Sequence, residues 1–181
     1  MNSLSTMALA LGSLLLGWHL FLGLWPRAAG RWLLAFPRQV WAGRILAALA
    51  LGGVVLVIWH AQIAWLDQHR WLFCALAPLA YILVLVFVDE LLAVRALGGI
   101  FLLVPAPLLA AAFVHQAPSR LLMTIFAYGL AGLGMVLVWS PYLFRKMVVP
   151  WIGRPALCRG VAVLGASLGA LMLLLGWLVY R

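Results

Sequence analysis

The sequence predicts an all-α integral membrane protein with about six transmembrane helices, short loops and two basic interfacial segments. Hydrophobic residues make up 68% of the 181 residues and charged residues only 8%, whereas soluble domains carry about 25% charged residues. The only acidic side chains are Asp67, Asp89 and Glu90. Because so few polar groups cannot cover a water-soluble core, lipid is the expected solvent.

Long apolar runs determine the predicted spans. A hydrocarbon core about 30 Å thick needs roughly 20 helical residues, and only helices or closed barrels satisfy every backbone group in lipid. The runs are continuous rather than alternating, which argues against a barrel. We expect one membrane domain over residues 1–181, with helices roughly at 4–25, 43–65, 71–88, 92–113, 120–139 and 160–180.

The basic residues indicate the orientation, because short loops rich in Lys and Arg stay in the cytoplasm. The N-terminal tail has no charged side chain, and most basic residues fall in loops one and five. We therefore expect a bacterial inner-membrane protein with both termini outside and loops one, three and five in the cytoplasm. The side chains predicted to contact anionic lipid headgroups are Arg27, Arg31, Arg38, Arg44, Arg145, Lys146, Arg154 and Arg159.

Loops one and five combine tryptophan, arginine and proline, which is typical of segments that lie in the headgroup layer. Arg27, Arg31 and Arg38 would share one helical face, although Pro37 should interrupt it. The segments could form a diffuse polybasic collar or hold a specific phospholipid headgroup. Nucleic acid is not an expected partner despite the net charge of +9, because the basic clusters alternate with apolar runs.

Small residues predict where helices approach closely. Gly165, Gly169 and Gly176 fall near one face of the last span, and further glycines cluster in the fifth. We expect the glycine faces of the fifth and last spans to pack on each other or on a partner. Burial of these faces inside the monomer is the preferred expectation.

The central hairpin holds candidate ion-coupling residues. Asp89 and Glu90 end the third span, and Arg95 follows about one and a half helical turns later. Charges at membrane depth usually pair or line a functional cavity, but the same residues could form a solvated turn. Pro78 and Pro105 add kinks that could outline a small cavity, as in transporters.

Three histidines are candidate metal or haem ligands. His60, His69 and His115 map to the expected outer side, near Asp67, and imidazole with carboxylate is a common ligand set. No two of these histidines have the spacing of a preformed helical site, so no cofactor is predicted and haem or metal binding remains an alternative.

Catalytic signatures do not favour an enzyme. Residues 165–169 match Gly-x-Ser-x-Gly, but a nucleophile elbow needs a preceding strand, and few ionisable groups are available for acid–base chemistry. The leading prediction is an accessory or scaffold subunit that assembles with other membrane subunits or with itself. The alternatives are a small-solute or ion transporter using the central hairpin, and a haem or metal protein.

Overall fold

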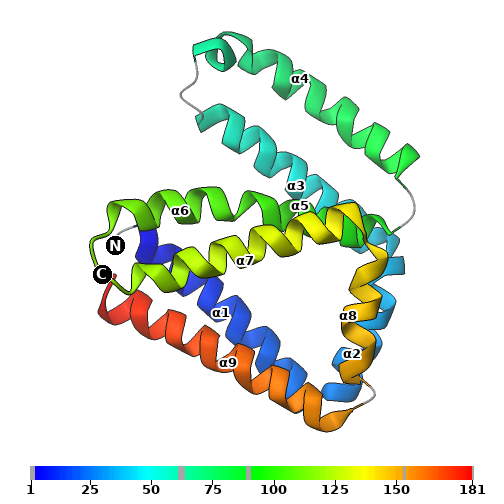
Figure 1. Cartoon of the computed structure of the whole chain (residues 1–181). Helices are drawn as coiled ribbons and strands as arrows, with labels where there is room; N and C mark the ends of the chain where they lie inside the picture. The colour runs from blue at the N-terminus through cyan, green and yellow to red at the C-terminus, as the bar shows by residue number, and fades with distance from the viewer. Residues whose placement is uncertain (1–2, 61–63, 89–90, 153, 181) are drawn as a thin grey trace. The chain divides into compact units, whose positions relative to one another are not determined.

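A computed structural model of the chain describes residues 3–60, 64–88, 91–152 and 154–180. These residues form helices joined by short connections and include no strand (Figure 1). Among the described residues, six helical stretches are long and apolar enough to cross a membrane, which confirms the predicted all-α membrane class. They are Ser3–Leu24, Val40–His60, Gln68–Phe87, Leu92–Val114, Arg120–Trp139 and Ala156–Leu178.

Most helix boundaries lie close to those predicted. Helix α1 spans Ser3–Leu24 and α7 spans Arg120–Trp139. Helix α3 (Val40–His60) begins at Val40 rather than at residue 43, and α4 (Ala64–Phe87) begins at Ala64 rather than at 71. The polar segment expected to form a loop before residue 71 therefore belongs to α4.

Proline divides the predicted helix 92–113 into two. Helix α5 spans Leu92–Leu103 and α6 spans Pro105–Val114, with a turn at Val104 between them. Pro105 lacks a backbone N–H and its ring crowds the preceding turn, so it is better placed at the start of a helix. Pro78, by contrast, lies inside α4 without ending it.

The two basic segments are themselves helical. Helix α2 spans Pro26–Ala35 and is followed by the short 3₁₀ helix η1 (Phe36–Arg38), where Pro37 ends the α-helical pattern as expected. Helix α8 spans Tyr142–Ile152. The last helix, α9 (Pro155–Leu178), begins with proline after an extended Arg154.

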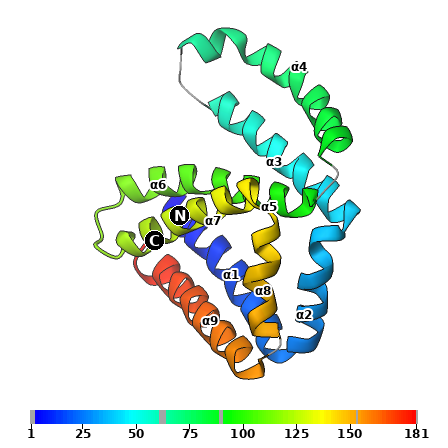
Figure 2. The same cartoon turned by 45° about the vertical axis from the view of Figure 1, so that its right-hand side comes forward.

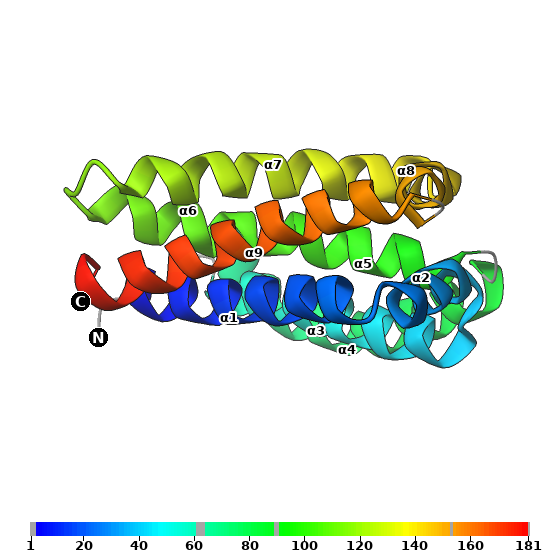
Figure 3. The same ribbon diagram turned by 90° about the horizontal axis from the view of Figure 1, so that it is seen from below.

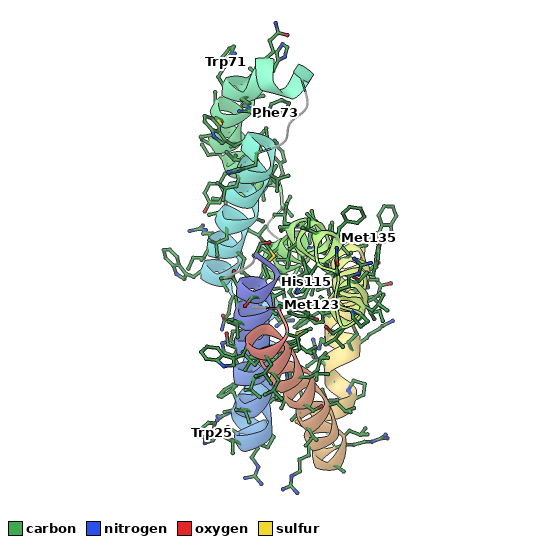
Figure 4. The ribbon with its side chains drawn as sticks, turned by 90° about the vertical axis from the view of Figure 1, so that its left-hand side faces the viewer. Trp25, Trp71, Phe73, His115, Met123 and Met135 are labelled. Atoms are coloured by element: carbon green, nitrogen blue, oxygen red, sulfur yellow. The ribbon has the colours of Figure 1, made fainter. Side chains whose placement is uncertain are left out.

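The contacts divide the chain into two compact units. Unit 1 comprises the described residues of Met1–Leu34, Val104–Leu130 and Arg145–Arg181, and unit 2 those of Ala35–Leu103 and Ala131–Phe144. In unit 1, α1 and α9 run side by side and antiparallel (Figures 1 and 3). The core of unit 1 includes Leu4, Met123, Met172 and Tyr180, all fully buried or nearly so. Met123 lies within this unit in Figure 4.

In unit 2, α3 packs on both α4 and α5. Figure 2 shows α3 and α4 as a helical hairpin. Ala47 of α3 is buried with Leu92 and Ala96 of α5, and a second cluster joins Val94 to Leu137. By contrast, none of the residues of the span Gln68–Phe87 in α4 is buried.

Candidate functional site

A partly polar cavity of unit 2 lies where α3 begins, α4 ends and α5 begins. It has a volume of about 460 Å³, within the range of about 300–1,000 Å³ typical of small-molecule sites. Its described lining residues are Pro37, Arg38, Gln39, Val40, Arg44, Leu85, Leu91, Leu92 and Ala93. Residues of loops one and three, far apart in sequence, thus share one cavity.

Two contacts bring these helix ends together. A Cβ atom on Gly43 would lie 3.0 Å from the backbone nitrogen of Ala93, so glycine allows α3 and α5 to approach closely. On the other flank, the Tyr81 hydroxyl of α4 donates a hydrogen bond of 3.2 Å to the carbonyl of Arg44. The cavity is therefore a consequence of packing at the start of α3.

The wall of the cavity is basic. Arg38 and Arg44 are both exposed, and the Arg44 guanidinium carbon lies 5.6 Å from the centre of the Trp41 ring. This cation–π geometry helps to hold the guanidinium in place. None of the nine described lining residues is acidic. Apart from the two arginines and Gln39, the described lining residues, such as Leu85 and Leu92, are apolar, so positive charge meets an apolar surface here.

The backbone at one side of the cavity is strained. Leu91 has φ of 58° and, among the described residues, is the only non-glycine residue with positive φ. A left-handed conformation costs an L-residue roughly 1–2 kcal/mol, and strain of this kind often marks a functional site. The conformation turns the chain into α5, whose first residue, Leu92, also lines the cavity.

The chain matches no protein-family model, no curated protein and no solved structure. The two arginines of the cavity are chemically suited to an anion, because guanidinium groups offer several N–H donors in a fixed geometry that fits carboxylate and phosphate.

The candidate ion-coupling residues are only partly described. Asp89 and Glu90 lie outside the residues that the structure describes. Arg95 is exposed on α5, one turn beyond the buried Leu92. The prediction that these three side chains act together therefore stays a prediction.

The predicted headgroup contacts are all surface residues. The eight side chains, Arg27, Arg31, Arg38, Arg44, Arg145, Lys146, Arg154 and Arg159, are exposed. In unit 1 the helices α2 and α8 that carry several of them meet where Gly30 faces Ile152, with a Cβ on Gly30 reaching to 3.0 Å of the Ile152 side chain. Sequence reasoning did not anticipate this contact between the two basic segments.

The candidate metal ligands are spread over both units. His60 is exposed, and its Nδ1 lies 2.9 Å from the carbonyl of Leu56 in its own helix. His69 also belongs to unit 2, whereas His115 belongs to unit 1. Within the described part of the chain, no group of three or more His, Cys, Asp or Glu side chains is placed to hold a metal ion.

His115 instead belongs to a polar cluster in unit 1. Arg120 Nη1 donates to the carbonyls of Phe113 (3.3 Å) and His115 (2.7 Å), and so satisfies groups at the end of α6. The Tyr180 hydroxyl donates to the carbonyl of Ser119 at 2.7 Å, and its ring meets the His115 ring edge-on at 5.1 Å. The cluster ties the end of α9 to the connection between α6 and α7.

Sequence reasoning missed this cluster. A tyrosine next to the C-terminal arginine is typical of an interfacial aromatic, yet Tyr180 is fully buried. The signal that could have revealed it is the polar loop 115–120, whose backbone groups need partners wherever the loop is covered. Figure 4 places His115 at one end of unit 1 and Trp25 at the other.

The glycine face of α9 packs on α1. Gly169 lies against Gly12 and Leu16, Gly176 against Ala8 and Leu9, and Gly165 against the ring of His19. The sequence left the partner of this face open between the fifth span and another chain, and in unit 1 the face packs on α1. Ser5 supports the contact, because its buried hydroxyl donates a 2.7 Å hydrogen bond to the carbonyl of Gly176.

Proposed function

We propose that this polytopic membrane protein is an accessory subunit of a larger membrane complex, and that α4 packs on a transmembrane helix of another subunit. The observation that carries the proposal is a stripe of large apolar side chains along α4. These residues recur at alternating intervals of four and three, and they are Leu72, Leu76, Leu79, Leu83 and Val86. Each is between 37% and 63% exposed.

This spacing is the heptad pattern of helices that pack at a small crossing angle, a geometry common in membrane bundles. The opposite side of α4 is already used, because Tyr81, Val84 and Leu85 pack against the cluster around Ala47 of α3. Lipid alone places no demand on the interval between leucines, whereas knobs-into-holes packing does. The regular stripe therefore favours a helical partner.

The test is the size and composition of the complex from its native membrane in mild detergent. Replacing Leu76 and Leu83 with Ala should reduce the complex to the free chain. The matched control replaces Leu14 and Leu164, which are 71% and 72% exposed on α1 and α9, and should leave the complex intact. Equal behaviour of both double variants, or a wild-type chain that runs as a monomer or homo-oligomer, would contradict the proposal.

A transporter is the second candidate, and the break at Val104 supports it. Pro105 lacks the N–H that would continue the hydrogen-bond ladder of the span Leu92–Val114, although Val104 keeps helical φ and ψ, and backbone groups freed at membrane depth can form solute sites. Asp89, Glu90 and Arg95 would then be the coupling residues.

Flux measured with the purified chain in proteoliposomes tests this candidate. Glu90→Gln should abolish a flux that Gln116→Glu, in another loop, leaves unchanged. Flux that persists unaltered in Glu90→Gln would count against a transporter that couples through this residue.

A further inference from the structure

We propose that the cavity at the start of α3 binds the phosphate group of an anionic phospholipid. This inference does not depend on the proposed subunit role. It names Arg38, Gln39 and Arg44 as the polar contacts and distinguishes this one cavity from the other basic residues of the chain.

The charge of the cavity favours an anion. Two guanidinium groups line one cavity of about 460 Å³, and no described lining residue offsets them. Arginine binds phosphate through paired, charge-assisted hydrogen bonds, which are stronger than neutral ones. Arg44 is also positioned by its ring contact with Trp41, so less side-chain freedom is lost when an anion binds.

The backbone at the cavity also favours an anion. Helices α3 and α5 both begin at the cavity, with Val40 and Leu92 in its wall, and neither has an acidic residue in its first turn. The first N–H groups of a helix have no acceptor within it and carry partial positive charge. Two helix starts therefore add to the field of the two arginines.

The apolar walls of the cavity favour a lipid over free phosphate. Pro37, Val40, Leu85, Leu91 and Leu92 give the cavity apolar walls. A free phosphate ion would gain nothing from these walls and would lose hydration beside them. A phospholipid places its phosphate near the arginines while its glycerol and first acyl carbons cover the apolar side chains, as expected for a site at the headgroup layer.

The acids Asp89 and Glu90 immediately precede Leu91 in the chain. The experiment must therefore measure whether Arg38 and Arg44 are available to bind a phosphate group. Native mass spectrometry of the full chain in mild detergent counts bound phosphatidylglycerol against phosphatidylcholine. Wild type should retain one phosphatidylglycerol selectively. Arg38→Gln with Arg44→Gln should weaken this binding by about tenfold or more, as expected for losing charge-assisted contacts.

The control double variant, Arg27→Gln with Arg31→Gln, removes the same charge from exposed positions of α2 and should keep the lipid. Equal loss in the two double variants would mean a diffuse collar and would overturn the proposal, as would a wild type without selectivity. If the first double variant does not fold, Gln39→Glu tests the cavity with a single added charge, against Gln116→Glu as control. Inorganic phosphate alone distinguishes the sources: binding as tight as that of the lipid would overturn the lipid assignment.

Discussion

Gly12 of α1 and Gly169 of α9 face each other so closely that each occupies the space a side chain would need on the other. A Cβ on Gly12 would lie 2.9 Å from the Gly169 carbonyl oxygen, and a Cβ on Gly169 would lie 3.0 Å from the Gly12 oxygen and 2.6 Å from the backbone nitrogen of Leu16. Because these neighbours are backbone atoms, they cannot rotate away. Close backbone approach of this kind drives helix association in lipid.

Gly169→Ala should therefore destabilise unit 1. Overpacking a tight contact typically costs about 1–3 kcal/mol, and the free energy of unfolding in mixed micelles of mild detergent and SDS measures it. Gly160→Ala is the matched control on the same helix, because a Cβ there meets nothing within 4 Å. Equal losses of unfolding free energy in Gly169→Ala and Gly160→Ala would show that the close α1–α9 contact does not require glycine at position 169.

Tyr180→Phe should lower the stability of unit 1 by about 0.5–1.5 kcal/mol, because the Ser119 carbonyl would lose one of its two hydrogen-bond donors and keep only the N–H of Leu122. The bond is 2.7 Å long and the tyrosine is fully buried. The same substitution at Tyr128, which is 65% exposed, should change stability by far less. A thermal unfolding curve of Tyr180→Phe that overlays that of Tyr128→Phe would refute the role of this bond.

Leu91→Gly should be tolerated, whereas Leu92→Gly should not. Glycine adopts the φ of 58° at Leu91 without steric cost, and the relief of roughly 1–2 kcal/mol offsets lost contacts and added chain entropy. Leu92 is only 9% exposed and begins α5, so its removal should cost about 2–5 kcal/mol.

Unfolding of the two glycine variants in SDS titrations measures the difference. If Leu91→Gly is as destabilising as Leu92→Gly, then packing rather than backbone strain dominates at position 91.

Much of the fold could be predicted because hydrocarbon imposes a length on each span. The runs beginning near Leu4 and Arg120 match α1 and α7 closely for this reason. The break at Val104 was harder to predict. A proline in a membrane helix can leave the helix continuous, as Pro78 does in α4, or divide it, as Pro105 does between α5 and α6. Local sequence does not distinguish these outcomes; the neighbouring contacts do.

The candidate cavity could be predicted only in part. Arg38 and Arg44 were predicted as headgroup contacts from their place in a basic loop, but so were six other basic residues. What distinguishes the two is the meeting of loops one and three, which depends on the close approach of Gly43 to Ala93. Neither the positive φ of Leu91 nor the Tyr81–Arg44 hydrogen bond leaves a recognisable pattern in a sequence rich in leucine.

The basic residues of loop one predict the orientation of the chain in the membrane. Arginines in loop one should hold residues 27–44 in the cytoplasm, since moving them across the membrane during insertion is unfavourable. In a background with Cys74→Ala and Cys158→Ala, a cysteine replacing Gln116 should react with a membrane-impermeant maleimide in intact cells. A cysteine replacing Arg31 should react only after permeabilisation. Both positions are exposed, so accessibility within the protein does not explain a difference. The opposite labelling pattern would invert the topology and place the lipid site in the outer leaflet.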